Sequence, residues 1–218
     1  MNVSNLGTAL QAGTEYSSTG LYNSENRSIG VNEGLHTIYS WGLYSVCGYT
    51  SNATWDSGGA CTTSSIAHSF GPFDAILQDV PLQYGNVVAW LILNAGRTTK
   101  FTNSGYFEAL TQTAYYFILI ATVFTWIALG MCIWKTTATL LFTNLFLISS
   151  AISCLISSRI WSAVISEARN INDIRIAQGT SIGIVIEQGN ALNILWAAFT
   201  LMVVALLPYQ ISWRTYRR

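Results

Sequence analysis

Long uncharged stretches dominate the second half of the chain. Residues 109–134, 136–158 and 188–213 contain no Asp, Glu, Lys or Arg. A helix that crosses a bilayer needs about 20 predominantly apolar residues. The pattern therefore predicts three membrane helices, at residues 109–134, 140–160 and 190–213.

A single charged residue, Lys135, separates the first two uncharged runs. The connection between the first two helices, residues 135–139, must therefore be short. A short connection predicts that the two helices form an antiparallel hairpin.

The first half of the chain has a different pattern. Residues 1–108 are rich in Gly, Ser, Thr, Asn and Tyr, and their apolar stretches are short, as at residues 35–46 and 87–93. These stretches are β-branched or aromatic, so they predict strands of a small antiparallel sheet. The segment between Pro72 and Pro81 is expected to be a loop.

A second polar segment, residues 161–189, lies between the last two predicted membrane helices. Its start has apolar residues at helical spacing (Trp161, Val164 or Ile165, Ala168 and Ile171). We therefore expect the second membrane helix to continue as an amphipathic helix. For the β-prone residues 180–187 two alternatives remain, an added strand of the outer sheet or an early start of the last membrane helix.

The composition supports a membrane protein. Hydrophobic residues make up 51% of the chain and charged residues only 9%, whereas soluble domains carry about 25% charged residues. The formal net charge is zero, so there is no basic field to attract nucleic acid, and nucleic-acid binding is not expected.

Cysteines and glycosylation sequons indicate which side of the membrane residues 1–108 face. Cys47 and Cys61 lie close together, and a thiol pair stays oxidised outside the cytosol; we predict a disulfide, the alternative being two free thiols. The three sequons begin at Asn2, Asn26 and Asn52, and glycosylation occurs on exported segments. Residues 1–108 are therefore expected to be extracellular.

The basic residues agree with this orientation. With residues 1–108 outside, Lys135 and the three arginines of the tail, residues 214–218, face the cytosol, as the positive-inside rule requires. Export of residues 1–108 needs a preceding signal, yet residues 1–40 lack a basic start followed by an apolar stretch. We expect a first membrane helix to be missing from the chain; the alternative is an unusual topology.

Residues for catalysis, cofactor binding or metal binding are not evident. The two histidines, His36 and His68, belong to no ligand spacing, and satisfied structural histidines are expected. The chain also lacks a Gly-x-Ser-x-Gly motif, a phosphate loop and a dinucleotide fingerprint. The sequence therefore predicts neither an enzyme nor a cofactor.

The predicted membrane helices contain features of helix packing. Ser150, Cys154 and Ser158 recur at four-residue intervals, so they place small side chains on one helix face where another helix can approach closely. Asn144 and Asn193 are expected to form hydrogen bonds between helices. The spans carry no ionisable group of the kind that marks a transport pathway.

One motif resembles a known family. The residues Gly42-Leu43-Tyr44, followed by Cys47, then Cys61 and three membrane helices, resemble the Gly-Leu-Trp…Cys…Cys signature of claudin-like four-span proteins. Tyr44 stands where that family has Trp. The chain is most similar to the fungal branch typified by the eisosome protein Sur-seven and the pH-response protein PalI.

The resemblance implies a four-span plasma-membrane protein with a disulfide-bonded outer β-sheet. Such proteins organise membrane domains, including eisosome-like patches, and contact the cell wall or neighbouring proteins. The expected partners are the lipid bilayer, other membrane proteins and further copies of the chain. The alternative is an accessory or sensor subunit of a signalling or channel complex, as in ambient-pH signalling or calcium influx.

Overall fold

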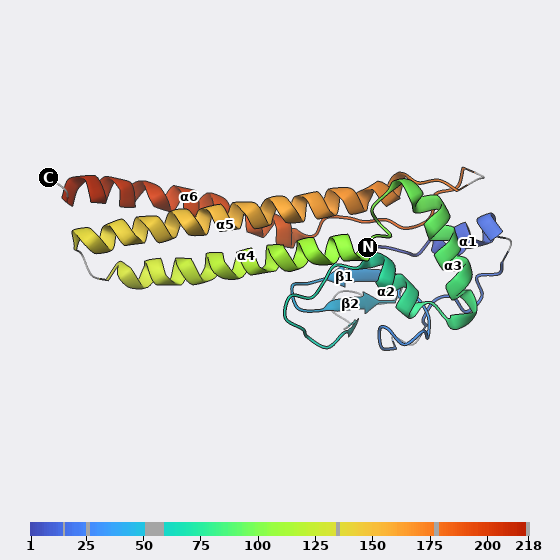
Figure 1. The fold of residues 1–218 in the computed structure, drawn as a ribbon. Coiled ribbons are helices and arrows are strands. Elements are labelled where there is room, and N and C mark those ends of the chain that lie inside the picture. Colours follow the sequence, from blue (N-terminus) through green and yellow to red (C-terminus); the bar gives the residue numbers. More distant parts are fainter. Residues whose placement is uncertain (15, 25–26, 51–58, 134–135, 177–178, 217–218) are drawn as a thin grey trace. The chain divides into compact units, whose positions relative to one another are not determined.

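The computed structural model describes residues 1–14, 16–24, 27–50, 59–133, 136–176 and 179–216. They belong to two compact units (Figure 1). Unit 1 comprises Met1–Thr111 and Val164–Glu187, and unit 2 comprises Gln112–Ala163 and Gln188–Arg218.

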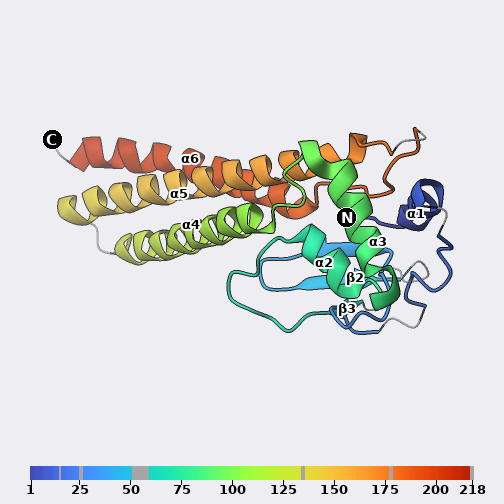
Figure 2. The ribbon, with the colours of Figure 1, turned by 45° about the vertical axis from the view of Figure 1, so that its right-hand side comes forward.

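Unit 1 contains a three-stranded antiparallel sheet (Figure 2). The strands β1 (Ile38–Trp41), β2 (Val46–Tyr49) and β3 (Ala60–Cys61) lie in the order β1-β2-β3. Trp41 pairs with Val46 where β1 turns into β2. A small antiparallel sheet was expected in this half of the chain, and the structure confirms it.

The N-terminal segment extends this sheet through isolated bridges. Asn2 pairs with Ile38 on one side and with Val185 on the other. The backbone nitrogen of Asn2 donates to the oxygen of Val185 at 2.7 Å, and the nitrogen of Val185 donates to the oxygen of Asn2 at 2.8 Å. The β-prone residues 180–187 therefore contact the sheet, whereas helix α6 (Asn190–Tyr216) begins only after them.

Unit 1 also contains three helices: α1 (Leu6–Thr14), α2 (Pro72–Asp79) and α3 (Leu82–Ala95), the last followed by the short helix η1 (Gly96–Thr98). Helix α3 contacts both α1 and α2. Two predictions were wrong here. Residues 87–93, expected as a strand, lie within α3, and the segment between the two prolines is α2 rather than a loop.

The physical reason for both errors is local. Proline is well suited to the first position of a helix, and Pro72 starts α2 in this way. In α3, Val88, Leu91 and Ile92 are buried at helical spacing. A short apolar run cannot be assigned to strand or helix by its periodicity alone.

The core of unit 1 is built from large apolar side chains of both its chain segments. The fully buried ones include Leu6, Leu10, Leu21, Leu35, Tyr39, Ile76, Ile92, Phe101, Phe107, Ile171, Ile182 and Ile184. Val164 and Ala168 are buried, which confirms that the second long helix continues amphipathically, as far as Arg169. Ile171 is also buried, but it lies in the following short helix η2 (Asn170–Asp173).

Unit 2 consists of long helices. Its segments belong to α4 (Ser104–Met131), α5 (Thr137–Arg169) and α6, and these three helices are each long and apolar enough to cross a membrane. Ser157 of α5 contacts Ala114 of α4, and the earlier Ser150 contacts the later Ala121. The two helices therefore run antiparallel, as the short connection predicts.

Gly183 is closely packed against the backbone of Asn5 in unit 1, and a substitution can test this packing. It has φ +78°, and a Cβ there would lie 2.3 Å from the backbone of Asn5. Gly179 has a similar φ, +76°, but open space around it. Gly179→Ala should cost about 1–2 kcal/mol of unfolding free energy through backbone strain alone, and Gly183→Ala a further ~1–3 kcal/mol through overlap. Urea unfolding of both variants in micelles measures the difference; equal midpoints would contradict the close packing of Gly183 on Asn5.

Candidate functional site

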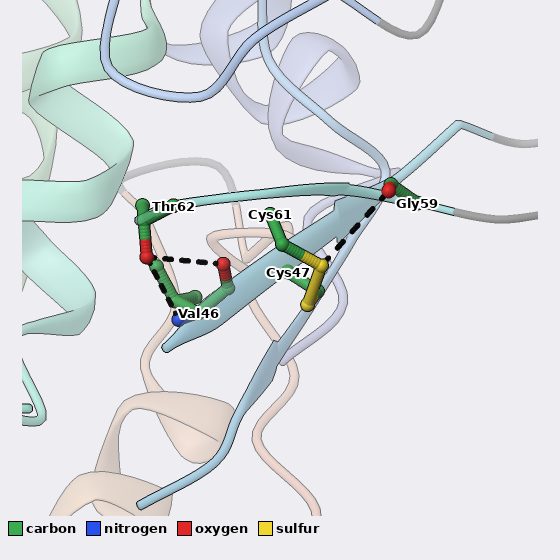
Figure 3. Close-up of a disulfide and its surroundings, with 5 residues drawn as sticks. All are labelled: Val46, Cys47, Gly59, Cys61 and Thr62. Carbon is green, nitrogen blue, oxygen red and sulfur yellow. Dashed lines mark hydrogen bonds between the residues drawn. A yellow bond between two sulfur atoms is a disulfide. The ribbon is translucent and has the colours of Figure 1, made fainter. Parts of the chain in front are cut away.

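A disulfide joins the central strand β2 to the edge strand β3 of the sheet in unit 1. Cys47 on β2 and Cys61 on β3 lie directly opposite each other, with their Cα atoms 4.0 Å apart, and their sulfur atoms are bonded (Figure 3). The structure thus confirms the predicted disulfide, and it excludes the alternative of two free thiols at these positions.

The disulfide holds a strand that is too short to be stable by itself. β3 has two residues, and Thr62 extends its contact with β2: its backbone nitrogen donates to the oxygen of Val46 at 2.9 Å, while its hydroxyl oxygen accepts from the Val46 nitrogen at 3.1 Å. Figure 3 shows the two hydrogen bonds that the Thr62 hydroxyl forms with the nitrogen and the oxygen of Val46, beside the disulfide. The covalent bond therefore keeps β3 attached to β2.

The motif residues Gly42, Leu43 and Tyr44 lie in the turn between β1 and β2. Two backbone hydrogen bonds join this turn to the segment after the second cysteine: Ser65 donates to the oxygen of Tyr44 at 2.8 Å, and His68 donates to the oxygen of Leu43 at 3.2 Å. The Tyr44 residue is 51% exposed. The motif thus forms a fixed turn that presents an aromatic side chain at the surface of unit 1.

One of the three sequons lies in the described part of the chain. Asn2 is exposed, and its side-chain oxygen accepts a hydrogen bond from the backbone nitrogen of Ser4 at 2.9 Å. Asn26 and Asn52 lie outside the described residues. Glycosylation at all three positions stays a prediction.

The predicted packing face of α5 is buried within unit 2. Ser150 donates a hydrogen bond to the oxygen of Ala121 on α4 at 2.8 Å and lies 3.4 Å from the sulfur of Met202 on α6. The sulfur of Cys154 lies 3.8 Å from the oxygen of Leu195 on α6. These two small side chains therefore lie where α5 meets both neighbouring helices.

Ser158 and Ser157 complete this face in different ways. Ser158 is fully buried, and its hydroxyl donates to the oxygen of Cys154 in its own helix at 2.8 Å. Ser157, which the four-residue spacing does not include, donates to the oxygen of Ala114 on α4 at 3.0 Å. The contact surface is therefore wider than the single row of residues that the spacing predicts.

The two membrane-helix asparagines differ from each other. The side-chain nitrogen of Asn144 donates to Leu140 in its own helix at 3.1 Å and to the oxygen of Tyr209 on α6 at 3.4 Å. Asn193 is exposed, and its side-chain oxygen accepts from Gln188 at 2.9 Å. The predicted interhelical bond is correct for Asn144 and wrong for Asn193, which lies in the first turn of α6, where a polar side chain finds a partner just before the helix.

A buried polar network in unit 1 was not predicted. Asp79 at the end of α2, His36 before β1 and Tyr39 on β1 are each at most 1% exposed. The side-chain oxygen Oδ2 of Asp79 lies 3.0 Å from Nδ1 of His36 and 2.6 Å from the hydroxyl of Tyr39. His36 is thus a satisfied structural histidine, as expected, while its partners are 43 and 3 residues away in sequence.

Two further groups complete this network. Oδ1 of Asp79 accepts from the backbone nitrogen of Gly30, and Nε2 of His36 lies 3.0 Å from the carbonyl oxygen of Arg27. Burial, together with the neighbouring carboxylate of Asp79, raises the pKa of Tyr39 well above its usual range. Tyr39 therefore keeps its proton and serves as a hydrogen-bond donor.

Within the described ranges, no three His, Cys, Asp or Glu side chains lie close enough together to hold a metal ion. No protein-family model, curated protein or solved structure matches the chain. The disulfide-bonded sheet and the apolar helices are therefore the features from which a function can be inferred.

Loss of the disulfide should destabilise unit 1. The bond closes a loop with a sequence separation of 14, so replacing both cysteines, Cys47→Ala with Cys61→Ala, should lower the free energy of unfolding by about 3 kcal/mol. Denaturant unfolding followed by tryptophan fluorescence measures this loss. Cys132→Ala, which removes a free thiol, is the control. Free thiols at Cys47 and Cys61 in mass spectrometry of non-reduced protein would contradict the bond.

Added bulk on the packing face should destabilise unit 2. Cys154 is 2% exposed, whereas Ile152 on the same helix is 53% exposed. Cys154→Leu should therefore cost about 1–3 kcal/mol through overpacking, while Ile152→Leu should change the stability by less than about 0.5 kcal/mol. Thermal unfolding in micelles and native gels compare them. Equal stability and assembly state in the two variants would show that Cys154 is not at a tight contact.

Proposed function

We propose that the protein is a claudin-like, multi-pass plasma-membrane protein of the Sur-seven and PalI type. In this proposal it organises membrane domains, such as eisosome-like patches in fungi, and makes contacts at the cell surface or with the cell wall. The observation that carries the proposal is the disulfide-bonded sheet, with its Gly42-Leu43-Tyr44 turn, on a chain that also contains three apolar helices.

The surfaces of the three helices support lipid as their surroundings. Trp126 on α4 is 73% exposed and Leu201 on α6 is 70% exposed, whereas the buried positions of α5 include Ser150 and Ser157. A helix of a water-soluble protein shows the opposite distribution, with large apolar side chains buried and polar side chains exposed. Small residues at helix contacts and large apolar residues around them are typical of helices packed in a bilayer.

The disulfide supports an extracellular position for unit 1. A structural disulfide persists in an oxidising compartment and is rare in the cytosol. The three sequons, of which Asn2 has an exposed side chain, are consistent with glycosylation of this unit. We therefore place residues 1–108 outside the cell in this proposal.

Helix α3 supports a role in contacts with other molecules. Its buried side chains are Val88, Leu91 and Ile92, while Leu82 is 82% exposed and Trp90 is 57% exposed. Leu93, three positions after Trp90 and therefore on the same side of α3, is 48% exposed, and neighbouring exposed apolar side chains are typical of a protein contact. Other membrane proteins, or further copies of the chain, are the partners that this proposal implies.

The distribution of the protein in cells tests the proposal. A fluorescent fusion should form stable patches at the cell edge. Leu82→Gln with Trp90→Gln should disperse these patches, because the two substitutions remove apolar side chains of the proposed contact surface. The fold should be retained, since both side chains are exposed. Ile66→Gln, at a residue 77% exposed elsewhere in unit 1, is the matched control and should leave the patches intact.

A diffuse distribution of the unmodified protein would contradict the organising role. If such a diffuse protein is recovered with one channel or receptor at equal stoichiometry, the accessory or sensor role replaces it. Retention of patches by the double variant would instead show that α3 is not the contact surface.

A further inference from the structure

A row of exposed side chains runs along α5 through unit 2, and it is apolar over most of its length. Its apolar members follow one another at intervals of three or four residues, so they lie on one side of the helix. The row then reaches a charged residue, because Arg159 follows Ile152 by two helical turns and is exposed as well. The exposed row includes Leu141, Leu145, Ile148, Ile152 and Arg159.

The contacts within unit 2 show the level at which Arg159 lies. Before it along α5, Ser157 donates to the oxygen of Ala114, near the point where α4 enters unit 2. After it, the hydroxyl of Ser162 accepts from Nε1 of Trp196 at 3.4 Å, in the second turn of α6. Arg159 therefore lies at the end of unit 2 where α4 enters and α6 begins.

This level corresponds to one surface of a bilayer. Helix α5 begins at Thr137, and from there to Arg159 it rises about 33 Å at ~1.5 Å per residue, against a hydrocarbon thickness of about 30 Å. Residues 136–158 carry no charge. Trp161 and Trp196 lie close to the same level, and tryptophan is enriched where membrane meets water. We therefore expect Arg159 among the lipid headgroups and the apolar row against the acyl chains.

A charged side chain in this position needs an anion beside it. No ion pair within the described part of the chain includes Arg159, and the row that it continues is aliphatic. A cation on the lipid-facing side of a helix is costly unless its charge reaches polar groups at the membrane surface. Phospholipid phosphates are the anions at that surface, and a guanidinium binds phosphate through two parallel hydrogen bonds.

We propose that Arg159 binds the phosphate group of a phospholipid, and that an acyl chain of this lipid lies along Ile152, Ile148 and Leu145. The helix presents a cation and then an apolar row, in the order in which a phospholipid presents its phosphate and its hydrocarbon. The inference rests on the part of the proposed function that places α4, α5 and α6 in lipid. It adds a specific lipid site to that placement.

The same helix contains a second exposed arginine that serves as a control. Arg169 is the last residue of α5 and belongs to unit 1. It lies about 15 Å further along the helix axis than Arg159, at ~1.5 Å per residue, and therefore beyond the headgroups. Arg169 has the same side chain but should contribute nothing to lipid binding at the row.

Native mass spectrometry of the full chain tests the proposal, in maltoside micelles that contain no phosphate. Phosphatidylglycerol is titrated, and the fraction of protein with bound lipid gives the affinity. Arg159→Leu extends the apolar row and removes the cation, so it should weaken binding at least about tenfold, the effect of losing a charge-assisted contact. Arg169→Leu should bind as the unmodified protein does. Equal affinity of Arg159→Leu and the unmodified protein would overturn the proposal.

Two further ligands separate the parts of the lipid in the unmodified protein. Diacylglycerol with the same acyl chains lacks the phosphate and should bind about tenfold more weakly than phosphatidylglycerol. Inorganic phosphate in excess lacks the acyl chains and should not displace the bound lipid. Equally tight binding of diacylglycerol would refute the phosphate contact, and displacement by inorganic phosphate would show a plain anion site instead of a lipid site.

The fold should survive both substitutions, because Arg159 and Arg169 are exposed, and thermal unfolding in the same micelles checks this. The two ligand comparisons need no variant, so they can overturn the proposal even if Arg159→Leu does not fold. The organising role is tested separately by the patches of the fluorescent fusion. Loss of lipid binding and loss of patches therefore distinguish a failure of this inference from a failure of the proposed function.

Discussion

A polar group that is shielded from water must find its hydrogen bonds within the protein, and this constraint shapes both units. In unit 2 the hydroxyls of Ser150 and Ser157 donate to carbonyl oxygens of the neighbouring helix α4. In unit 1 the carboxylate of Asp79 is surrounded by donors from a loop, a strand and a histidine. In each case the polar contact joins segments that are far apart in the chain, so it determines which segments can pack together.

The same constraint explains why small residues occupy the contacts of α5. A serine or cysteine allows the backbones of two helices to approach closely enough for its side chain to reach a carbonyl oxygen. Ser150 does so with α4, and Cys154 lies against α6. Large side chains such as Trp126 are left on the outside, where a bilayer can accept them without loss of hydrophobic free energy.

Much of this architecture follows from the sequence, because uncharged runs of more than 20 residues have few alternatives to a membrane helix. The disulfide between Cys47 and Cys61 was likewise predictable from the cysteine and sequon pattern. The helices α2 and α3 were not, since their apolar runs are short and fit a strand or loop equally well. The network of His36, Tyr39 and Asp79 was also missed: it depends on a contact between residues 43 positions apart, which no local pattern reports.

The pairing of Asn2 with both Ile38 and Val185 has a consequence for the order of synthesis. Chains emerge from the ribosome N-terminus first, so the N-terminal segment can meet β1 early. Its other edge has no partner until residue 185 has been made, after the whole of α5. Unit 1 therefore cannot be completed until residue 185 of the 218 has been made, which is more than four fifths of the chain.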